Sequence, residues 1–214
     1  MIKACIFDLD GTLLDTLGGI AYYVNQRLIA EGLPPISERE TSRYVGHGAY
    51  DLIASTLKAR GVTDGDTVAR VLSEYKADYD RAPTYLVKPY DGIKEIISAL
   101  MADEITVAVL SNKPDFATRS MVKGYFGDIA AHGARDGIPL KPEPDSLVAM
   151  MEELSVSSDE CLFIGDTEYD LATARNAGVA CVAVSWGFRT AEQLSAAGAE
   201  RIISHPSELL KFIH

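Results

Sequence analysis

The stretch Ala4-Cys5-Ile6-Phe7-Asp8-Leu9-Asp10-Gly11-Thr12 decides the fold of this chain. Its first four residues are continuously apolar, which is typical of a strand covered on both faces of a parallel sheet. Asp8 and Asp10 follow at once, and Gly11 allows a sharp turn behind them. An isolated Asp-Gly-Thr is usually just a turn, but two like charges that close a buried strand gain nothing there. The stretch therefore predicts a parallel sheet with a site at its edge.

Further apolar runs alternate with segments of helical period, which predicts a Rossmann-like α/β core with a parallel sheet. We expect strands over residues 105–110, 129–131, 161–164, 181–184 and 201–203. We expect helices over residues 92–101, 144–154, 170–177 and 206–213, where apolar residues recur on one face.

One segment breaks this alternation. From Thr16 to Arg81 there is no strand-like run, only helical patterning over residues 20–30, 50–60 and 68–80, divided by turn signals. This predicts a small α-helical cap inserted after the first strand. We expect residues 1–14 and 85–214 to form the catalytic core and residues 15–84 to form the cap.

Four polar clusters follow or lie near the ends of the predicted strands. They are Asp8 to Thr12, Ser111-Asn112-Lys113-Pro114, Lys141-Pro142, and Gly165-Asp166-Thr167 with Asp170. Each has a simpler interpretation alone: a turn, a helix cap at Ser111 and Asn112, a surface Lys141, or a helix N-cap at Asp166. Because ligands of open α/β sheets bind outside the carboxyl ends of the strands, we expect the clusters to converge.

The residue types in these clusters suit phosphoryl transfer, in which a hard cation and a lysine neutralise the transferring group. Magnesium prefers oxygen ligands, and Asp8, Asp166 and Asp170 supply them. A carboxylate can also act as a covalent nucleophile. Asp8 can therefore attack while Asp10 handles protons.

Composition excludes several classes of partner. The net charge of −11 argues against nucleic acid, because binding a polyanion requires clustered cations. No apolar run is long enough to cross a bilayer, and the N-terminus enters a strand directly without a signal peptide. Cys5, Cys161 and Cys181 lie in apolar runs, as small hydrophobes in a reducing compartment do. We expect a cytoplasmic protein without nucleic-acid or membrane partners.

The four clusters, in this order, resemble the motifs of the haloacid dehalogenase superfamily, most of whose members are phosphatases. The resemblance covers essentially the whole chain, including the helical insertion. Three further stretches look like its phosphoglycolate phosphatase branch: Ser111-Asn112-Lys113-Pro114, Lys141-Pro142-Glu143-Pro144 and Val184-Ser185-Trp186-Gly187. The resemblance implies a Mg²⁺-dependent hydrolase of a small phosphorylated metabolite, such as a phosphoglycolate-like monoester.

The resemblance also implies roles for single residues. Asp8 would attack phosphorus and form an aspartyl-phosphate, while Asp10 would protonate the leaving oxygen and then activate water. The phosphate-binding residues would be Ser111, Asn112, Lys141, Gly11 and Thr12. The magnesium ligands would be Asp8, the carbonyl of Asp10, Asp166, and Asp170 directly or through water.

The helical cap would exclude water and recognise the leaving group. Arg43 and His47 are the candidates in its specificity loop, although a solvated Arg43 and a His47 in a turn are an equal alternative. Lys113 and Arg189 are further candidates for substrate contact.

Several functions remain open. An inorganic pyrophosphatase and a sugar-phosphate phosphatase are compatible with these residues. A phosphomutase is disfavoured because Gly46-His47-Gly48-Ala49-Tyr50 offers no Arg for a second phosphate. A non-catalytic phospho-receiver is disfavoured because such domains lack the helical insertion. The sequence is compatible with both a monomer and a homodimer.

Overall fold

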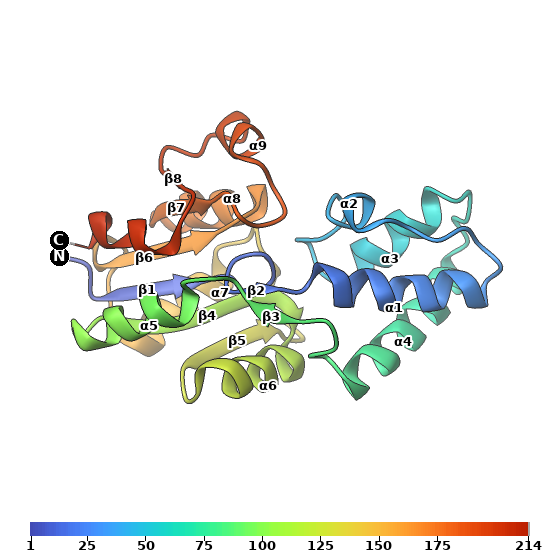
Figure 1. The fold of residues 1–214 in the computed structure, drawn as a ribbon, viewed down its shortest axis with the longest axis horizontal. Coiled ribbons are helices and arrows are strands. Elements are labelled where there is room, and N and C mark those ends of the chain that lie inside the picture. The colour runs from blue at the N-terminus through green and yellow to red at the C-terminus, as the bar shows by residue number, and fades with distance from the viewer. Residues whose placement is uncertain (214) are drawn as a thin grey trace. The chain divides into compact units, whose positions relative to one another are not determined.

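The computed structural model describes residues 1–213 and confirms the α/β class (Figure 1). The main sheet contains β1 (Ala4–Phe7), β4 (Thr106–Pro114), β5 (Ala130–Ala134), β6 (Cys161–Gly165), β7 (Ala180–Val184) and β8 (Ile202–Ile203). Their order is β5-β4-β1-β6-β7-β8, and every neighbouring pair is parallel. The carboxyl ends of these strands therefore share one edge of the sheet.

β1 lies at the centre of this sheet, between β4 and β6. Ala4 is in register with Thr106 on one side and with Cys161 on the other. All four residues of β1 are buried, as a strand covered on both faces requires. One face packs Ile6 and Phe163 against the apolar side of α7 (Asp145–Leu154).

Other helices join the strands of the core. They are α5 (Ile93–Ala102), α6 (Asp115–Phe126), α8 (Glu168–Ala177) and α9 (Ala191–Ala196). A 3₁₀ helix, η1, spans Ser158–Glu160. The sequence did not predict α6, whose buried face of Ala117, Thr118, Met121 and Val122 is only weakly apolar. The helical turns predicted for residues 206–213 are confirmed as η2 (Pro206–Phe212), which is a 3₁₀ helix with Pro206 at its start.

The chain divides into two compact units, one formed by Met1–Asp15 with the chain from Pro89 onward and the other by Thr16–Lys88. The second unit contains α1 (Leu17–Ala30), α2 (Glu38–Thr41), α3 (Ala49–Lys58) and α4 (Gly65–Arg81). Their apolar faces enclose a core that runs from Ile20 to Tyr79. The predicted boundary at residue 84 falls short of Lys88, and the roles of the two units remain a prediction.

Packing explains why the helical unit extends beyond residue 84. A Cβ on Gly19 of α1 would lie 2.5 Å from the carbonyl oxygen of Tyr85, so the absent side chain lets this segment lie against the helix. The Tyr23 hydroxyl donates a hydrogen bond to Ala82 O at 3.0 Å. Beyond this segment, β2 (Leu14–Asp15) and β3 (Lys88–Pro89) pair as a separate two-stranded sheet.

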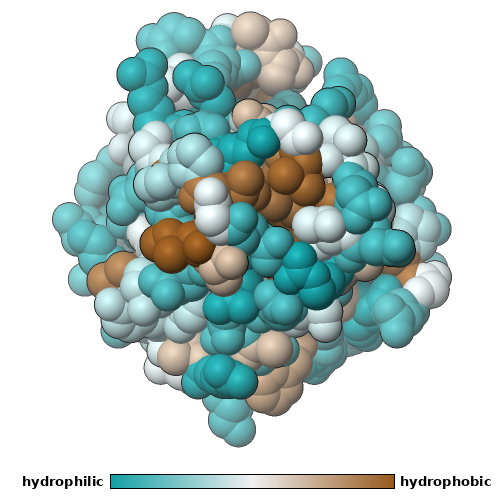
Figure 2. Space-filling view, turned by 90° about the vertical axis from the view of Figure 1, so that its right-hand side faces the viewer, coloured by the Kyte–Doolittle hydropathy of each residue, from teal (hydrophilic) through white to brown (hydrophobic). Residues whose placement is uncertain are grey.

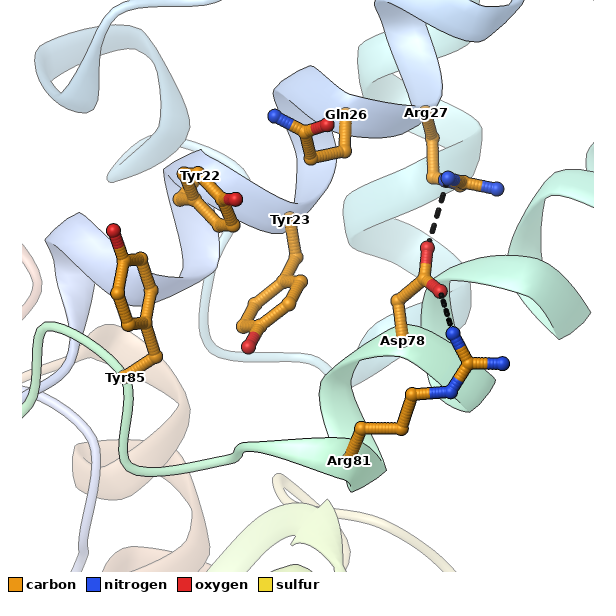
Figure 3. A pocket seen from close by; sticks show the side chains of 7 residues that line it. All are labelled: Tyr22, Tyr23, Gln26, Arg27, Asp78, Arg81 and Tyr85. Atoms are coloured by element: carbon orange, nitrogen blue, oxygen red, sulfur yellow. Dashed lines mark hydrogen bonds and ion pairs between the residues drawn. The ribbon is translucent and has the colours of Figure 1, made fainter.

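The helical unit also contains a cavity of about 330 Å³ beside these tyrosines (Figure 3). The rings of Tyr22 and Tyr85 form one wall, with centroids 4.7 Å apart. On another side Asp78 pairs with Arg27 at 2.9 Å and with Arg81 at 3.4 Å. These cations are already paired with carboxylates, so the cavity presents an aromatic surface more than a positive one.

The face shown in Figure 2 is mostly hydrophilic, with apolar residues gathered near its centre. Among residues 1–213, no helix is long and apolar enough to span a membrane.

Candidate active site

Asp8 follows β1 directly, and its main-chain N–H donates to Ile164 O on β6 at 2.8 Å. The Asp8 side chain is buried beside Lys141, whose Nζ lies 2.9 Å from Asp8 Oδ1. The two atoms form an ion pair, but no well-directed hydrogen bond from residues 1–213 reaches this buried oxygen. Lys141 Nζ also donates to Asp170 Oδ1 at 2.6 Å. Lys141, only 2% exposed, is thus held between two carboxylates rather than in solvent.

Three carboxylates meet at this point. One oxygen atom from each of Asp8, Asp166 and Asp170 lies within 4.8 Å of the others, and all three side chains are buried. Burial raises the pKa of Asp8 to about 7, against the opposing effect of the Lys141 ammonium. Burial, with the nearby Asp170 and Asp8 charges, also raises the pKa of Asp166 well above its ordinary value.

These buried charges fit a divalent cation. Three ionised carboxylates against the single Lys141 ammonium would leave two uncompensated negative charges. Asp8 Oδ1 is a buried oxygen without a hydrogen bond, and the donor atoms are carboxylate oxygens. Magnesium prefers such oxygens, and its charge would favour the ionised carboxylates.

Two neutral donors orient the Asp166 carboxylate. The Thr12 hydroxyl donates to Oδ1 at 2.9 Å, and the main-chain N–H of Phe188 donates to Oδ2 at 2.8 Å. Gly11 has φ +87°, and a Cβ there would collide with Asp166. The helix-cap interpretation of Asp166 is wrong, because Thr167 is the N-cap of α8. The fully buried side chain of Thr12 supports Asp166, and the predicted binding of phosphate by Thr12 remains a prediction.

Asp170 completes the start of α8. Its Oδ2 accepts bonds from the main-chain N–H and the hydroxyl of Thr167, at 3.0 and 2.7 Å, in a capping box. Because its Oδ1 accepts from Lys141 Nζ, both oxygens are engaged. Asp170 is therefore placed to hold Lys141, and its predicted contact with magnesium remains a prediction.

β4 continues through the second motif to Pro114, four residues beyond its predicted end. Ser111 is buried, and its hydroxyl accepts a bond from Lys113 N at 3.3 Å. Asn112 Nδ2 donates to Lys141 O at 3.0 Å, and Asn112 Oδ1 accepts from Lys141 N at 2.9 Å. These two bonds position Lys141, and the predicted binding of phosphate by Asn112 remains a prediction. The helix-cap interpretation of Ser111 and Asn112 is wrong, since Pro114 is the N-cap of α6.

Lys113 forms a buried ion pair that the sequence did not predict. Its Nζ lies 2.9 Å from Asp10 Oδ1 and 3.0 Å from Oδ2, and both side chains are largely buried. The sequence predicted that Lys113 contacts substrate from the rim of the site. Its ammonium is paired with the carboxylate expected to handle protons, and its contact with substrate remains a prediction.

The two cap candidates lie in the helical unit, between α2 and α3. Arg43 is exposed in the turn that follows α2. His47 Nδ1 pairs with the carboxylate of Asp51 in the first turn of α3. Their role in specificity remains a prediction.

The sequence singled out part of the loop that follows β7, but its contacts with the site were not predicted. Trp186 Nε1 donates to Thr12 O at 3.0 Å, and Phe188 N–H reaches Asp166. Arg189 pairs with Glu168 at 2.7 and 2.9 Å, and its predicted contact with substrate remains a prediction. One signal was available in the sequence: this loop follows a strand that ends at the same edge as the motifs.

Comparisons with known proteins agree with this geometry. Residues 5–184 match the family model of the haloacid dehalogenase-like hydrolases. A phosphoglycolate phosphatase of Rhodospirillum rubrum is 35% identical, over 93% of this chain and 86% of that protein. An N-acetylmuramic acid 6-phosphate phosphatase of Pseudomonas aeruginosa is 33% identical, over 98% and 93%. A crystal structure from Lactobacillus delbrueckii subsp. bulgaricus, provisionally assigned as a phosphoglycolate phosphatase, has TM-score 0.94 and 29% identity, over 99% and 98%.

Proposed function

The chain belongs to the haloacid dehalogenase-like hydrolase family, as its motifs predicted, and on this premise we propose that it hydrolyses phosphomonoesters through an aspartyl-phosphate on Asp8. Its relatives make it a phosphoglycolate phosphatase-like enzyme. One observation carries the proposed mechanism: Asp8, Asp166, Asp170 and Lys141 are buried together at the carboxyl edge of the sheet. Burying three acids with only one lysine destabilises the folded protein, because the negative charges are not fully compensated. A bound cation would compensate them, which is why this cluster supports a ligand site.

In the first half-reaction, an oxygen of Asp8 attacks phosphorus and the bond from phosphorus to the leaving oxygen breaks. This step requires Asp10 to carry a proton once substrate is bound, so its pair with the Lys113 ammonium must open first. Asp10 then gives that proton to the leaving oxygen, and the product leaves as a neutral alcohol. In the second, Asp10 takes a proton from water as the water oxygen attacks phosphorus. Inorganic phosphate leaves and the Asp8 carboxylate is restored.

Lys141 is held where it can neutralise the phosphoryl oxygens beside Asp8, and the Ser111 hydroxyl is a second candidate donor to them. We propose Mg²⁺ as the cofactor, held by Asp8, the carbonyl of Asp10 and Asp166. When bound, the cation would offset charge on the phosphoryl group.

We propose a phosphorylated hydroxy acid as the substrate, with phosphoglycolate as the first candidate. The named substrates of the Rhodospirillum and Pseudomonas relatives are both phosphorylated acids, although one is small and the other is a sugar. The Pseudomonas relative makes a sugar-phosphate phosphatase the second candidate. A carboxylate in the same molecule as the phosphate is the feature that the two substrates share.

Two measurements test the proposal. Purified protein should hydrolyse a generic aryl phosphate with Mg²⁺, and Asp8→Asn should abolish turnover while Asp10→Asn keeps Mg²⁺ binding and loses turnover. Absence of turnover with every ester, or full activity in Asp8→Asn, refutes the mechanism. For the substrate class, phosphoglycolate is compared with 2-hydroxyethyl phosphate, which carries an alcohol in place of the carboxylate. Equal kcat/KM for the two esters refutes recognition of an acid.

A further inference from the structure

The loop Ser185–Arg189, called the 185–189 loop below, follows β7 and is fixed at both ends. Ser185 N–H and Oγ–H both donate to Ile203 O on the edge strand β8, at 3.0 and 3.1 Å. At the other end, the guanidinium of Arg189 forms two parallel bonds to the Glu168 carboxylate at the start of α8. Such a bidentate pair holds both distance and orientation. The loop therefore has little freedom to move away from the sheet edge.

The middle of the 185–189 loop reaches two separate strand ends. Trp186 Nε1 donates to the carbonyl oxygen of Thr12, which follows β1 in the sequence, at 3.0 Å. Phe188 N–H donates to Oδ2 of Asp166, which follows β6 directly in the sequence, at 2.8 Å. Since β1 and β6 are neighbours in the sheet, the loop ties together the two segments that supply the carboxylates Asp8 and Asp166.

Gly187 allows this close approach because it has no side chain. A Cβ there would lie 2.5 Å from both Cβ and Oδ2 of Asp166, and closer still to the carbonyl oxygen of Gly11. These atoms belong to the main chain and to a buried carboxylate. Moving either of them to make room for a side chain would disturb the surrounding packing and cost free energy. The backbone of Gly187 is thus packed directly against the candidate metal site.

We propose that the 185–189 loop is a positioning element of the metal site, which sets the Asp166 carboxylate and the Gly11–Thr12 main chain for binding a divalent cation. The inference rests on the proposed function for the identity of that cation. The physical basis of the inference is the kind of hydrogen-bond donor that contacts the Asp166 carboxylate. Thr12 Oγ1 and Phe188 N–H each occupy one site on an Asp166 oxygen and leave further lone pairs free. Because both donors are neutral, the carboxylate keeps its full charge for the cation.

The test measures Mg²⁺ binding by calorimetry without substrate, in wild type and in two variants. Gly187→Ala should raise the dissociation constant about 10- to 100-fold, which is typical when groups that orient a metal ligand are disturbed. Trp186→Phe removes one N–H donor but keeps an aromatic ring, and should raise it about fivefold. Gly124→Ala in α6 is the matched control, because a Cβ there meets nothing within 4 Å. It should bind Mg²⁺ as wild type does.

A second readout separates positioning from general damage. If the loop acts through the metal site, saturating Mg²⁺ should restore most of the turnover of an aryl phosphate in both variants. Trp186 is the single tryptophan in the sequence, so its emission should follow the Mg²⁺ titration in wild type and in Gly187→Ala.

The outcomes are distinct. Variants that are folded by circular dichroism and bind Mg²⁺ with the wild-type constant overturn the inference. If Gly187→Ala does not fold, Trp186→Phe decides alone. Wild-type protein that binds no Mg²⁺ refutes the cofactor of the proposed function together with this inference. Normal binding by wild type and by both variants refutes the role of the loop only.

Discussion

Breaking the buried pair between Lys113 and Asp10 should cost far more stability than breaking any surface pair of this protein. The ammonium lies 2.9 and 3.0 Å from the two carboxylate oxygens, with side-chain exposures of 6% and 12%. At that separation and an effective dielectric constant of about 20, the attraction is about 6 kcal/mol. Loss of one partner leaves the other charge buried and uncompensated. We expect Lys113→Met to lower the free energy of unfolding by about 3–5 kcal/mol.

The assay is a double-mutant cycle followed by urea denaturation. Lys113→Met and Asp10→Asn are measured singly and together, because the double variant removes both charges. It should be more stable than the sum of the single losses predicts, with a coupling energy of about 2–3 kcal/mol. Lys211→Met is the matched control, since this exposed lysine pairs with Glu208 at the surface. Its cost should stay below about 0.5 kcal/mol.

A coupling energy below about 0.5 kcal/mol would refute the reasoning, because it would mean that the two side chains do not share a buried ion pair. Equal losses in Lys113→Met and Lys211→Met would refute it equally, since burial would then have no effect.

Three further predictions concern other parts of the chain. Asn112→Ala removes both bonds to the main chain of Lys141, so we expect a loss of about 1–3 kcal/mol in urea denaturation and reduced turnover. Burial lowers the pKa of His132, so below its ordinary value of 6.5 the unfolded chain binds protons more readily than the folded one. The free energy of unfolding should therefore decrease as the pH is lowered from 7.5 to 5.5, and the decrease should be smaller in His132→Gln. The midpoints of urea denaturation at each pH measure this. Arg43→Ala or His47→Ala should change the preference between phosphoglycolate and a generic aryl phosphate more than the activity on the latter, measured as kcat/KM.

Each of these has a contrary result. Unchanged stability and turnover in Asn112→Ala would mean that its bonds do not hold Lys141. An identical acid-induced loss in His132→Gln would assign the pH dependence to other groups. If both cap variants keep the wild-type preference, the specificity residues lie elsewhere.

Sequence patterns could predict the sheet and the convergence of its motifs, because parallel strands end at one edge. Continuous apolar runs located β1 and β6 to within one residue, and Asp8 and Asp166 follow from those positions. Short elements were harder. β2 and β3 have two residues each and carry no periodicity, so the exit from the helical unit was placed too early.

The partners inside the site could not be predicted, since they depend on side-chain direction. Lys113 reaches Asp10 because β4 continues through the second motif as a strand. The same extension brings Asn112 to the main chain of Lys141, 29 residues later in the sequence. No pattern of residue types encodes either contact. The support of Asp166 by a main-chain N–H is also invisible in sequence, because every residue except proline could supply it.

The central position of β1 has a consequence for how the protein is made. Translation produces β1 before either of its partners, which begin at residues 106 and 161. The helical unit does not depend on later parts of the chain for its core, because that core comes from residues 20–79. During synthesis the helical unit can therefore become compact while the apolar strand that precedes Asp8 is still unpaired. Long-range pairing of this kind is slow and leaves strands open to aggregation. The central strand can therefore complete its pairing only after β6 has been synthesised.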